Sequence, residues 1–320
     1  MAMAIHEIDS VSILSLQDNY IDILVSDNDK IVQRPTITTF TTGAKPTITP
    51  GPAAEHGFSS FITVRHDGQE KNMLFDFGCS NNGAASNVDL LSVDLSNVSE
   101  LALSHGHFDH FGGMKELISR LPKKDYELVA HPSVFKKNRF LKAADGNNII
   151  FPELTREHVT SLGLSIKEAP KPVQMLGGYA LFLGEIPRTT SFEQGMPSAI
   201  CIEDGKEQQD IIEDDSSMIF NVKGKGLVVL SGCAHSGIVN TVRYAKEVTG
   251  IDDVYVIMGG FHLSGARQAP FIQPTIEALK EFAPKHIIPA HCTGRNATIE
   301  IEKAMPEEFI LNMSGTTLTF

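Results

Sequence analysis

The chain has no tryptophan, few cysteines and no long apolar segment, and each absence excludes a class of protein. Without tryptophan, neither sugar stacking on indole rings nor tryptophan anchoring at a membrane surface is available. No run approaches the roughly 18 apolar residues of a membrane-spanning helix. The four cysteines lie far apart and form no Cys-x-x-Cys pair, which excludes a small disulfide-stapled scaffold; they are Cys79, Cys201, Cys233 and Cys292.

Basic residues are also scarce relative to acidic ones. Lys and Arg number 27 against 39 Asp and Glu, which gives a formal net charge of −12. We therefore expect no nucleic-acid partner and no anionic membrane partner, although a local basic pocket stays compatible with this charge. The first 16 residues lack a basic leader and are interrupted by charged residues, so we expect no signal peptide and a cytoplasmic location.

The pattern of apolar segments predicts alternating strands and helices. Strands are expected at 61–65, 73–77, 101–104, 127–130, 217–222, 227–230, 254–258 and 286–288. Helices are expected at 112–121, 237–249 and 275–282. This alternation is typical of an α/β protein, and we expect one domain over residues 1–320 with loop insertions near 30–56 and 195–216. Residues 201–215 are acidic and polar, which predicts a solvated excursion.

One segment concentrates residues with metal-binding chemistry. The apolar strand at 101–104 leads directly into His105, His107, Asp109 and His110, followed by two glycines. Imidazole nitrogen and carboxylate oxygen are the ligands of zinc, iron or manganese. His105 and His107 point the same way from a strand end and can bind one ion, whereas Asp109 and His110 lie beyond, where the chain turns, and can address a second. A polar loop that only caps strand ends is the alternative, and four potential ligands in six residues argue against it.

Further candidate ligands follow other apolar strands: Cys233, His235, His262 and His291. Each alone is a weak signal, because a single strand-end histidine is more often a hydrogen-bonded structural group. Together with the first segment, however, they supply the remaining ligands that two metals need. Asp76 ends another strand, and a buried carboxylate in that position commonly orients a ligand histidine through its free N–H.

The His-x-His-x-Asp-His pattern after an apolar strand, preceded by Asp-x-Gly at 76–78, resembles the metallo-β-lactamase superfamily. Within it, the chain resembles the branch of 7,8-dihydropterin-6-yl-methyl-4-(β-D-ribofuranosyl)aminobenzene 5′-phosphate synthase-like metal-dependent hydrolases. The motifs of this narrower resemblance span roughly residues 20–312 and are Glu55–Gly57, Ser104–His110, Gly184–Arg188, Gly232–Asn240, Gly259–Leu263 and Pro289–Gly294.

The resemblance implies a four-layer αβ/βα sandwich, in which two mixed sheets pack face to face and helices lie outside. It also implies two divalent metal ions at one rim, with zinc as the first choice and manganese or iron as alternatives. By the family pattern, His105 and His107 bind the first metal. Asp109, His110 and His291 bind the second.

The chain departs from the family pattern in two places. The family's ligand histidine that precedes the bridging aspartate has no counterpart here, and Glu185 lies in that region as a candidate ligand or supporting group. The bridging aspartate itself is replaced by Cys233. We therefore expect His235 to complete the first metal site, and Cys233 to be either a thiolate ligand or a neighbour of the ligands. His262 is expected beside the ligands or facing the substrate.

A pair of divalent ions lowers the pKa of a bound water toward about 7, which supplies hydroxide at neutral pH. Our first hypothesis is therefore a hydrolase that uses a metal-bound hydroxide on an ester, a phosphoester or a related small molecule. Asp109 is the predicted catalytic residue, because it can orient that nucleophile. Arg188, Arg295 and His56 are candidate substrate-binding residues, and the two arginines suit a phosphorylated substrate. Solvation at the surface explains the arginines equally well.

The branch resemblance implies a second hypothesis, in which group transfer replaces hydrolysis. An aminobenzene-type nucleophile would displace pyrophosphate from a pterin, with the metal acting on the leaving group. A non-catalytic metal-binding module is a third reading, and it predicts gaps in the ligand set. A redox role with two irons is the fourth reading, and it has less support because no flavin-binding domain is evident. The sequence leaves the oligomeric state open.

Overall fold

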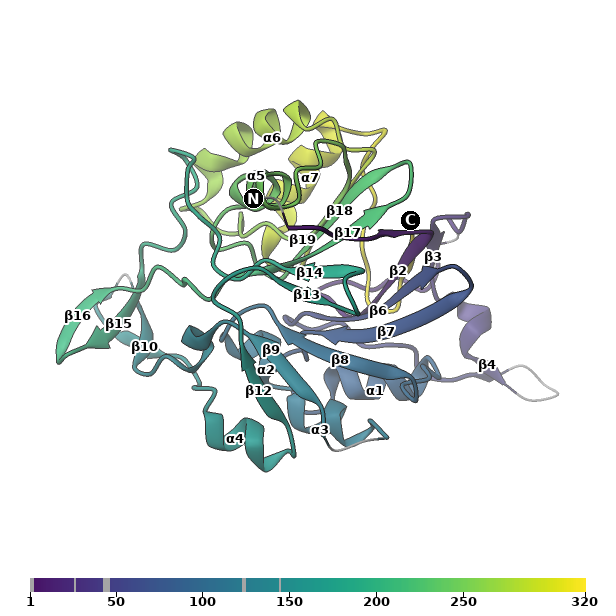
Figure 1. Cartoon of the computed structure of the whole chain (residues 1–320), viewed down its shortest axis with the longest axis horizontal. Coiled ribbons are helices and arrows are strands. Elements are labelled where there is room, and N and C mark those ends of the chain that lie inside the picture. The colour runs from purple at the N-terminus through teal and green to yellow at the C-terminus, as the bar shows by residue number, and fades with distance from the viewer. Residues whose placement is uncertain (1–2, 26, 43–46, 123–124, 144) are drawn as a thin grey trace.

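The computed structural model describes residues 3–25, 27–42, 47–122, 125–143 and 145–320. Within these ranges two mixed sheets pack face to face, and helices cover the outer side of each sheet (Figure 1). The family resemblance implies this four-layer sandwich, and the observed sheets and helices confirm it.

The first sheet has eight strands. In spatial order they are β12 (Ser165–Glu168), β9 (Glu127–Ala130), β8 (Val98–Leu103), β7 (Gln69–Phe75), β6 (Ser59–His66), β2 (Ser10–Gln17), β21 (Thr317–Thr319) and β3 (Val32–Gln33). The strands from β12 to β7 run parallel, and the others pair antiparallel. His66 pairs with Gln69, so the predicted turn at Asp67-Gly68 joins β6 to β7.

The second sheet has seven strands. Six of them follow the spatial order β13 (Val173–Met175), β14 (Ala180–Phe182), β17 (Ser217–Val222), β18 (Gly226–Ser231), β19 (Val254–Gly260) and β20 (His286–Ala290), and β1 (Glu7–Ile8) pairs with β17. The strands predicted at 217–222 and 227–230 form a hairpin, β17 and β18, with Ser217 opposite Ser231. Because β18, β19 and β20 are parallel, their carboxyl ends share one edge.

Helices cover both outer faces. The first sheet carries α1 (Gly83–Leu90), α2 (Phe108–Phe111), α3 (Met114–Ser119) and α4 (Arg156–Ser161), and the second carries α5 (Ile238–Thr249), α6 (Ile272–Glu281) and α7 (Arg295–Ala304). The helix expected at 112–121 is shorter than predicted. Gly112 ends α2, and a side chain there would collide with the Cys79 carbonyl. No helix among the described residues is long and apolar enough to cross a bilayer.

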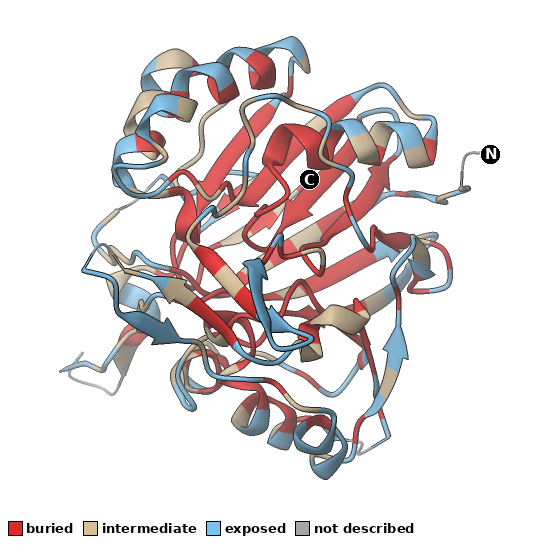
Figure 2. Cartoon of the chain, turned by 90° about the vertical axis from the view of Figure 1, so that its left-hand side faces the viewer, coloured by how far each residue is buried: buried red, intermediate tan, exposed pale blue. Residues whose placement is uncertain are grey.

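Apolar side chains form three layers of core. The central layer lies between the sheets and includes Phe58, Phe75, Phe220 and Met258. The other two layers lie between each sheet and its helices. Figure 2 shows the consequence: the strands are mostly buried, and the helices turn an exposed side outward.

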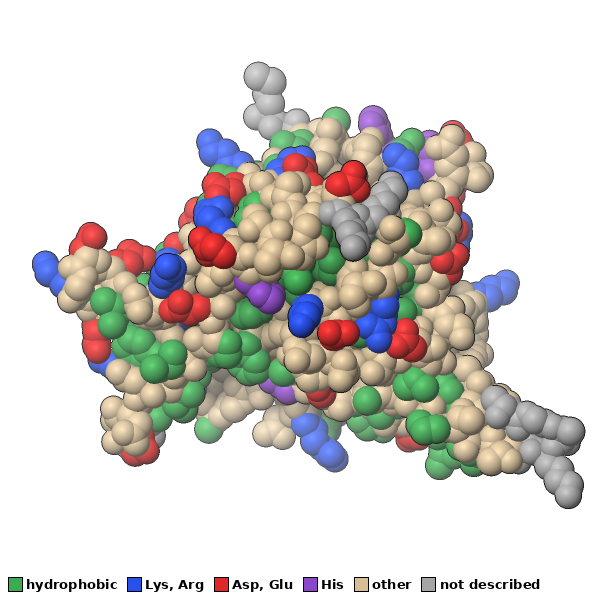
Figure 3. Space-filling view, turned by 90° about the horizontal axis from the view of Figure 1, so that it is seen from below, with side chains coloured by type: hydrophobic (Ala, Val, Ile, Leu, Met, Phe, Trp, Pro, Cys, Tyr) green, Lys and Arg blue, Asp and Glu red, His purple; other side chains and the backbone are tan. Residues whose placement is uncertain are grey.

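A third, small sheet projects from one end of the sandwich, and we call it the arm (left in Figure 1). Its strands are β11 (Asn148–Ile150), β10 (Arg139–Lys142), β15 (Ala199–Glu203) and β16 (Lys206–Gln209). Hydrophobic side chains reach its surface (Figure 3), among them Ile149, Ile150 and Ile202. The arm therefore has little core of its own, and β15 and β16 fall within the predicted insertion at 195–216.

The other predicted insertion, near 30–56, contains short elements where the sequence suggests an irregular loop. These are the 3-10 helix η1 (Ile37–Phe40) and the paired strands β4 (Thr41–Thr42) and β5 (Thr47–Ile48). Residues 43–46 lie outside the described residues.

Phe220 is fully buried between the two sheets, so its replacement tests the central core. We expect Phe220→Ala to lower the free energy of unfolding by about 3–5 kcal/mol, because it removes apolar contacts and leaves a cavity. Urea denaturation followed by circular dichroism measures this change. The exposed Ile150→Ala on the arm is the control and is expected to change the free energy by less than about 0.5 kcal/mol. Equal effects of the two substitutions would contradict the assignment of the core.

Candidate metal centre

The predicted ligands lie where strands of both sheets end. Asp76 follows β7, and His105 and His107 follow β8. The loops after β18, β19 and β20 carry the remaining candidates, namely Cys233, His235, His262 and His291. Parallel strands bring their carboxyl ends to one edge, so residues far apart in the sequence meet there.

His105, His107 and His235 form one compact group. The Nδ1 atom of His107 lies 3.0 Å from Nε2 of His105 and 3.1 Å from Nε2 of His235. All three side chains are buried. The structure thus brings together the three residues that the sequence assigns to the first metal.

The nitrogen atoms of this three-histidine group suit a shared cation. Ligand atoms of a tetrahedral zinc ion with Zn–N bonds of about 2.0–2.1 Å lie roughly 3.3 Å apart, close to the separations found here. Burial lowers the pKa of His107 to about 3 and lowers the pKa values of His105 and His235 well below their usual range. The rings are therefore neutral at pH 7, and a neutral imidazole is the form that binds a metal.

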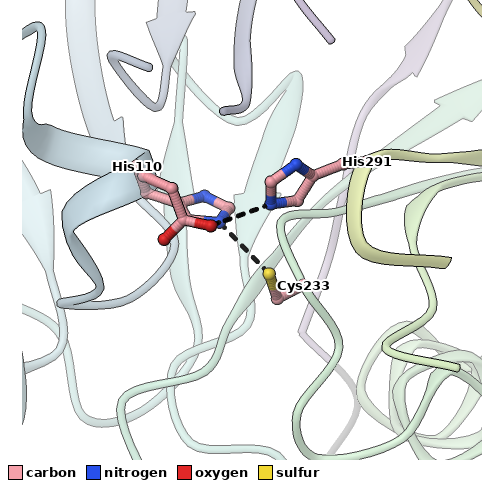
Figure 4. Close-up of side chains that lie close together, drawn as sticks. His110, Cys233 and His291 are labelled. Atoms are coloured by element: carbon pink, nitrogen blue, oxygen red, sulfur yellow. Dashed lines mark hydrogen bonds and ion pairs between the residues drawn. The ribbon is translucent and has the colours of Figure 1, made fainter. Parts of the chain in front are cut away.

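Asp109, His110, Cys233 and His291 form the second group, which is also buried. Asp109 Oδ2 lies 3.2 Å from His291 Nε2 and 3.9 Å from His110 Nε2. His110 Nε2 lies 3.2 Å from Cys233 Sγ. Figure 4 shows the side chains of His110, Cys233 and His291 pointing toward one another. Cys233 is thus one of four potential ligands here.

The protonation states of the second group differ from those of the first. Burial would lower the pKa of His110, but the Asp76 and Asp109 carboxylates raise it above its usual value. Burial would raise the pKa of Asp109, but the nearby imidazoles hold it far below its usual value. Burial raises the pKa of the Cys233 thiol well above its usual value. A cation entering this group would therefore displace protons.

Asp76 connects the two groups from behind. Its Oδ1 atom accepts the Ser104 N–H at 2.7 Å, and its Oδ2 atom accepts the Ser104 hydroxyl at 2.7 Å. Asp76 Oδ2 also lies 2.6 Å from Nδ1 of His110, which turns Nε2 of that ring toward Cys233. Ser104 Oγ lies 3.0 Å from Nδ1 of His105. The Asp76 carboxylate therefore orients a candidate ligand in each group. It orients His110 of the second group directly, and it orients His105 of the three-histidine group through Ser104.

His56 and Asn19 lie at the solvent side of the second group. The His56 side chain is 60% exposed, and its Nε2 atom lies 3.4 Å from Asp109 Oδ2. Its ring stacks on that of His291 at 4.8 Å between centroids. The Asn19 amide contacts both rings, lying 3.2 Å from Nδ1 of each.

The other predicted site residues differ in their placement. The His262 ring lies 4.2 Å from that of His235, beside the three-histidine group. Arg295 is exposed and lines a cleft of about 570 Å³ that His291 also lines. Arg188 donates a hydrogen bond to the Ile211 carbonyl. Glu185 is exposed, and within the described residues it belongs to neither group.

The prediction that residues 201–215 form a solvated excursion is wrong for three of the carboxylates in this segment. Asp210, Asp214 and Asp215 are at most 1% exposed. Asp214 accepts the Gly106 N–H at 2.7 Å, and Asp215 accepts the Ser236 N–H at 2.9 Å. The acidic and polar composition of the segment gives no signal for this arrangement, which follows from the pairing of Ser217 with Ser231 in the folded chain.

Comparison with known proteins identifies the family. The family model of the metallo-beta-lactamase superfamily matches residues 52–246. Over 275 residues the chain is 31% identical to the 7,8-dihydropterin-6-methyl-4-(beta-D-ribofuranosyl)-aminobenzene-5'-phosphate synthase of Methanocaldococcus jannaschii, which covers 83% of this chain and 90% of the relative. An uncharacterized protein of the same organism is 31% identical over 255 residues, covering 78% of this chain and 88% of its own length.

A solved structure supports the fold. The crystal structure of Tm1679, a metal-dependent hydrolase of the beta-lactamase superfamily, matches with a TM-score of 0.68 and 21% identity. The match covers 96% of this chain and 98% of that one. The family model spans more than half of the chain, and the synthase relative is aligned over most of both sequences. The chain therefore belongs to the metallo-β-lactamase superfamily of metal-dependent enzymes.

Proposed function

We propose that this protein is a metal-dependent hydrolase of a small ester or phosphoester. The observation that carries the proposal is the pair of adjacent buried groups of potential ligands. The two groups adjoin, because the rings of His105 and His110 lie 4.2 Å apart between centroids. Two neighbouring ions are the arrangement that many hydrolases use to attack and cleave one bond.

In this proposal His105, His107 and His235 hold the first ion, and Asp109, His110, Cys233 and His291 hold the second. Zinc is the metal that suits these donors best, because imidazole and thiolate are softer ligands than magnesium or calcium prefers, and manganese or iron are the alternatives. Divalent ions bound there would lower the pKa of a water molecule and polarise the bond to be broken.

Asp109 is the proposed catalytic residue. Its Oδ2 atom faces His110, His291 and His56, so the carboxylate reaches both the buried group and the solvent side. A carboxylate held ionised by these imidazoles accepts a hydrogen bond from a nucleophilic water and fixes its direction. His56 is mostly exposed, and Asn19 holds its ring, so we assign it a role in binding substrate.

The cleft beside His291 is the proposed binding site for the rest of the substrate. Its volume of about 570 Å³ is within the range typical of small-molecule sites. Ile299 and Leu311 contribute apolar side chains to the lining of the cleft, and Arg295 contributes a guanidinium. A guanidinium binds phosphate or carboxylate through two parallel hydrogen bonds, so we propose an anionic, phosphorylated substrate. Arg188 is not among the residues that line this cleft.

Group transfer is a second candidate function, and the synthase relative supports it. In this reaction the amine of the aminobenzene would form a bond to the pterin methylene carbon while the bond from that carbon to pyrophosphate breaks and pyrophosphate leaves; in hydrolysis water would take the place of the amine. The two reactions are separated by supplying the dihydropterin pyrophosphate with and without the ribofuranosyl-aminobenzene phosphate. Pterin consumption that needs the second substrate favours transfer, and consumption in water alone favours hydrolysis.

The metal content of the purified protein tests the central part of the proposal. We expect two transition-metal ions per chain in the wild type purified without added metal, measured by elemental analysis. His105→Ala removes one donor of the three-histidine group, so the content should fall to about one. His158→Ala on α4 replaces an exposed histidine and is the matched control, which should keep both ions. A wild type without stoichiometric metal would refute the proposal.

The role of Cys233 is tested by the protons that metal binding displaces. Because burial raises the pKa of the free thiol, the thiol is protonated at pH 7 and must lose its proton to become a ligand. We expect Cys233→Ser to release about one proton fewer per chain than the wild type. Calorimetric titration with zinc in two buffers of different ionisation enthalpy measures this number. Cys79→Ser, outside both groups, is the control, and equal release from all three proteins would exclude thiolate ligation.

A further inference from the structure

Two adjacent carboxylates lie behind the three-histidine group and are not among its ligands. Asp214 and Asp215 are both 0% exposed and lie three and two residues before the start of β17. A carboxylate is costly to bury unless hydrogen bonds or a counter-charge compensate it. The partners of these two residues therefore indicate what they contribute.

Asp214 holds the loop after β8. Its Oδ2 atom accepts the N–H of Gly106 at 2.7 Å, and Gly106 lies between His105 and His107. A side chain at Gly106 would collide with the backbone of Val134, so the loop is closely packed on its other side. The hydrogen bond and this contact together fix the backbone that carries two of the three histidines.

Asp215 holds the loop after β18. Its Oδ2 atom accepts the N–H of Ser236 at 2.9 Å, and the backbone of His235 also faces this carboxylate. The loop after β8 belongs to the first sheet, and the loop after β18 belongs to the second. Two consecutive residues therefore bind the backbones of both loops whose histidines must converge on one point.

Arg139 connects this pair to the arm. It lies on β10 and is 3% exposed. Its Nη1 atom donates to Asp214 Oδ2 at 3.1 Å, and its Nε atom lies 2.8 Å from Asp210 Oδ2. Phe151, which follows β11 of the arm, packs its ring 4.8 Å from that of His107. The arm thus contacts the three-histidine group through a buried ion pair and through an aromatic ring.

From these contacts we infer that Asp214 and Asp215 are positioning residues for the first metal site, and that Arg139 makes the arm a part of that site. The inference rests on the proposed function, because it assumes that the three histidines bind a metal. Residues that hold metal ligands from behind typically affect affinity by about 10–100-fold when they are replaced. Their hydrogen bonds to the N–H groups of Gly106 and Ser236 go to the two loops that carry the three histidines.

The test uses cobalt(II) as the probe, because cobalt distinguishes the two groups. Cys233 belongs only to the second group, so a thiolate-to-cobalt absorption band reports that site, and the weaker visible bands report both. The full-length variants Asp214→Asn and Asp215→Asn keep an oxygen acceptor but lose the charge. We expect each to bind the first-group ion about 10–100-fold more weakly than the wild type. The thiolate band should persist with a much smaller shift of its titration midpoint, because the charge of Asp215 also acts on His110 and Cys233.

Controls separate positioning from general stability. Glu207→Gln removes an exposed carboxylate that pairs with Lys142 on the arm, and it should bind both ions like the wild type. If Asp214→Asn does not fold, Arg139→Lys keeps the buried positive charge but loses the forked hydrogen bonds, and the same selective weakening is expected.

Three outcomes would overturn the inference. Wild-type affinity for both ions in the aspartate variants would show that the carboxylates do not position the site. Equal weakening of both ions would show a role only in general stability. A wild type in which only the second group binds cobalt would exclude the three histidines as metal ligands. A wild type that binds no cobalt would instead refute the proposed function, and the inference would fall with it.

Discussion

The structure depends on the burial of many polar side chains at one edge where two sheets end. Seven potential metal ligands are buried there, and each needs a partner that replaces hydration. In the first group burial lowers the pKa values of the imidazoles, which keeps them neutral at pH 7. In the second group burial raises the pKa of the Cys233 thiol, and the Asp76 and Asp109 carboxylates raise that of His110. Under the proposed function, a divalent cation would be the partner of each group. This requirement explains why the supporting carboxylates lie behind the ligands, where they orient them without competing for the ion.

Much of the fold, and the gathering of most candidate ligands at one edge, could be predicted from the sequence, for a local reason. Short apolar runs ended by glycine, histidine or cysteine mark strand ends, and parallel strands bring those ends together. The segment 104–110 is specific because few structural roles demand three histidines and an aspartate within six residues. His235 could be placed because the missing family histidine left one coordination position to fill, and His235 follows the correct strand.

The features that the sequence did not predict depend on contacts between distant residues, which no local pattern encodes. Asp214 and Asp215 lie in a stretch whose composition resembles a solvated loop, and only the pairing of β17 with β18 turns them inward. Arg139 gains its role from a sheet whose strands are separated by more than 50 residues, β10 and β15. The short α2 helix, which carries Asp109 and His110, ends at Gly112, where close packing against Cys79 leaves no room for a side chain. Exposure of Glu185 likewise could not be read from its neighbours in the sequence.

The candidate ligands come from loops of both sheets, and this affects how the protein reaches its native state. The histidines at 105 and 235 come together only after the two sheets have packed, so an unfolded or half-assembled chain offers no comparable binding pocket. Ions that bind the native form alone shift the equilibrium toward it in proportion to their free concentration. Under the proposed function, metal supply in the surroundings would therefore act on the stability of the folded chain as well as on its chemistry.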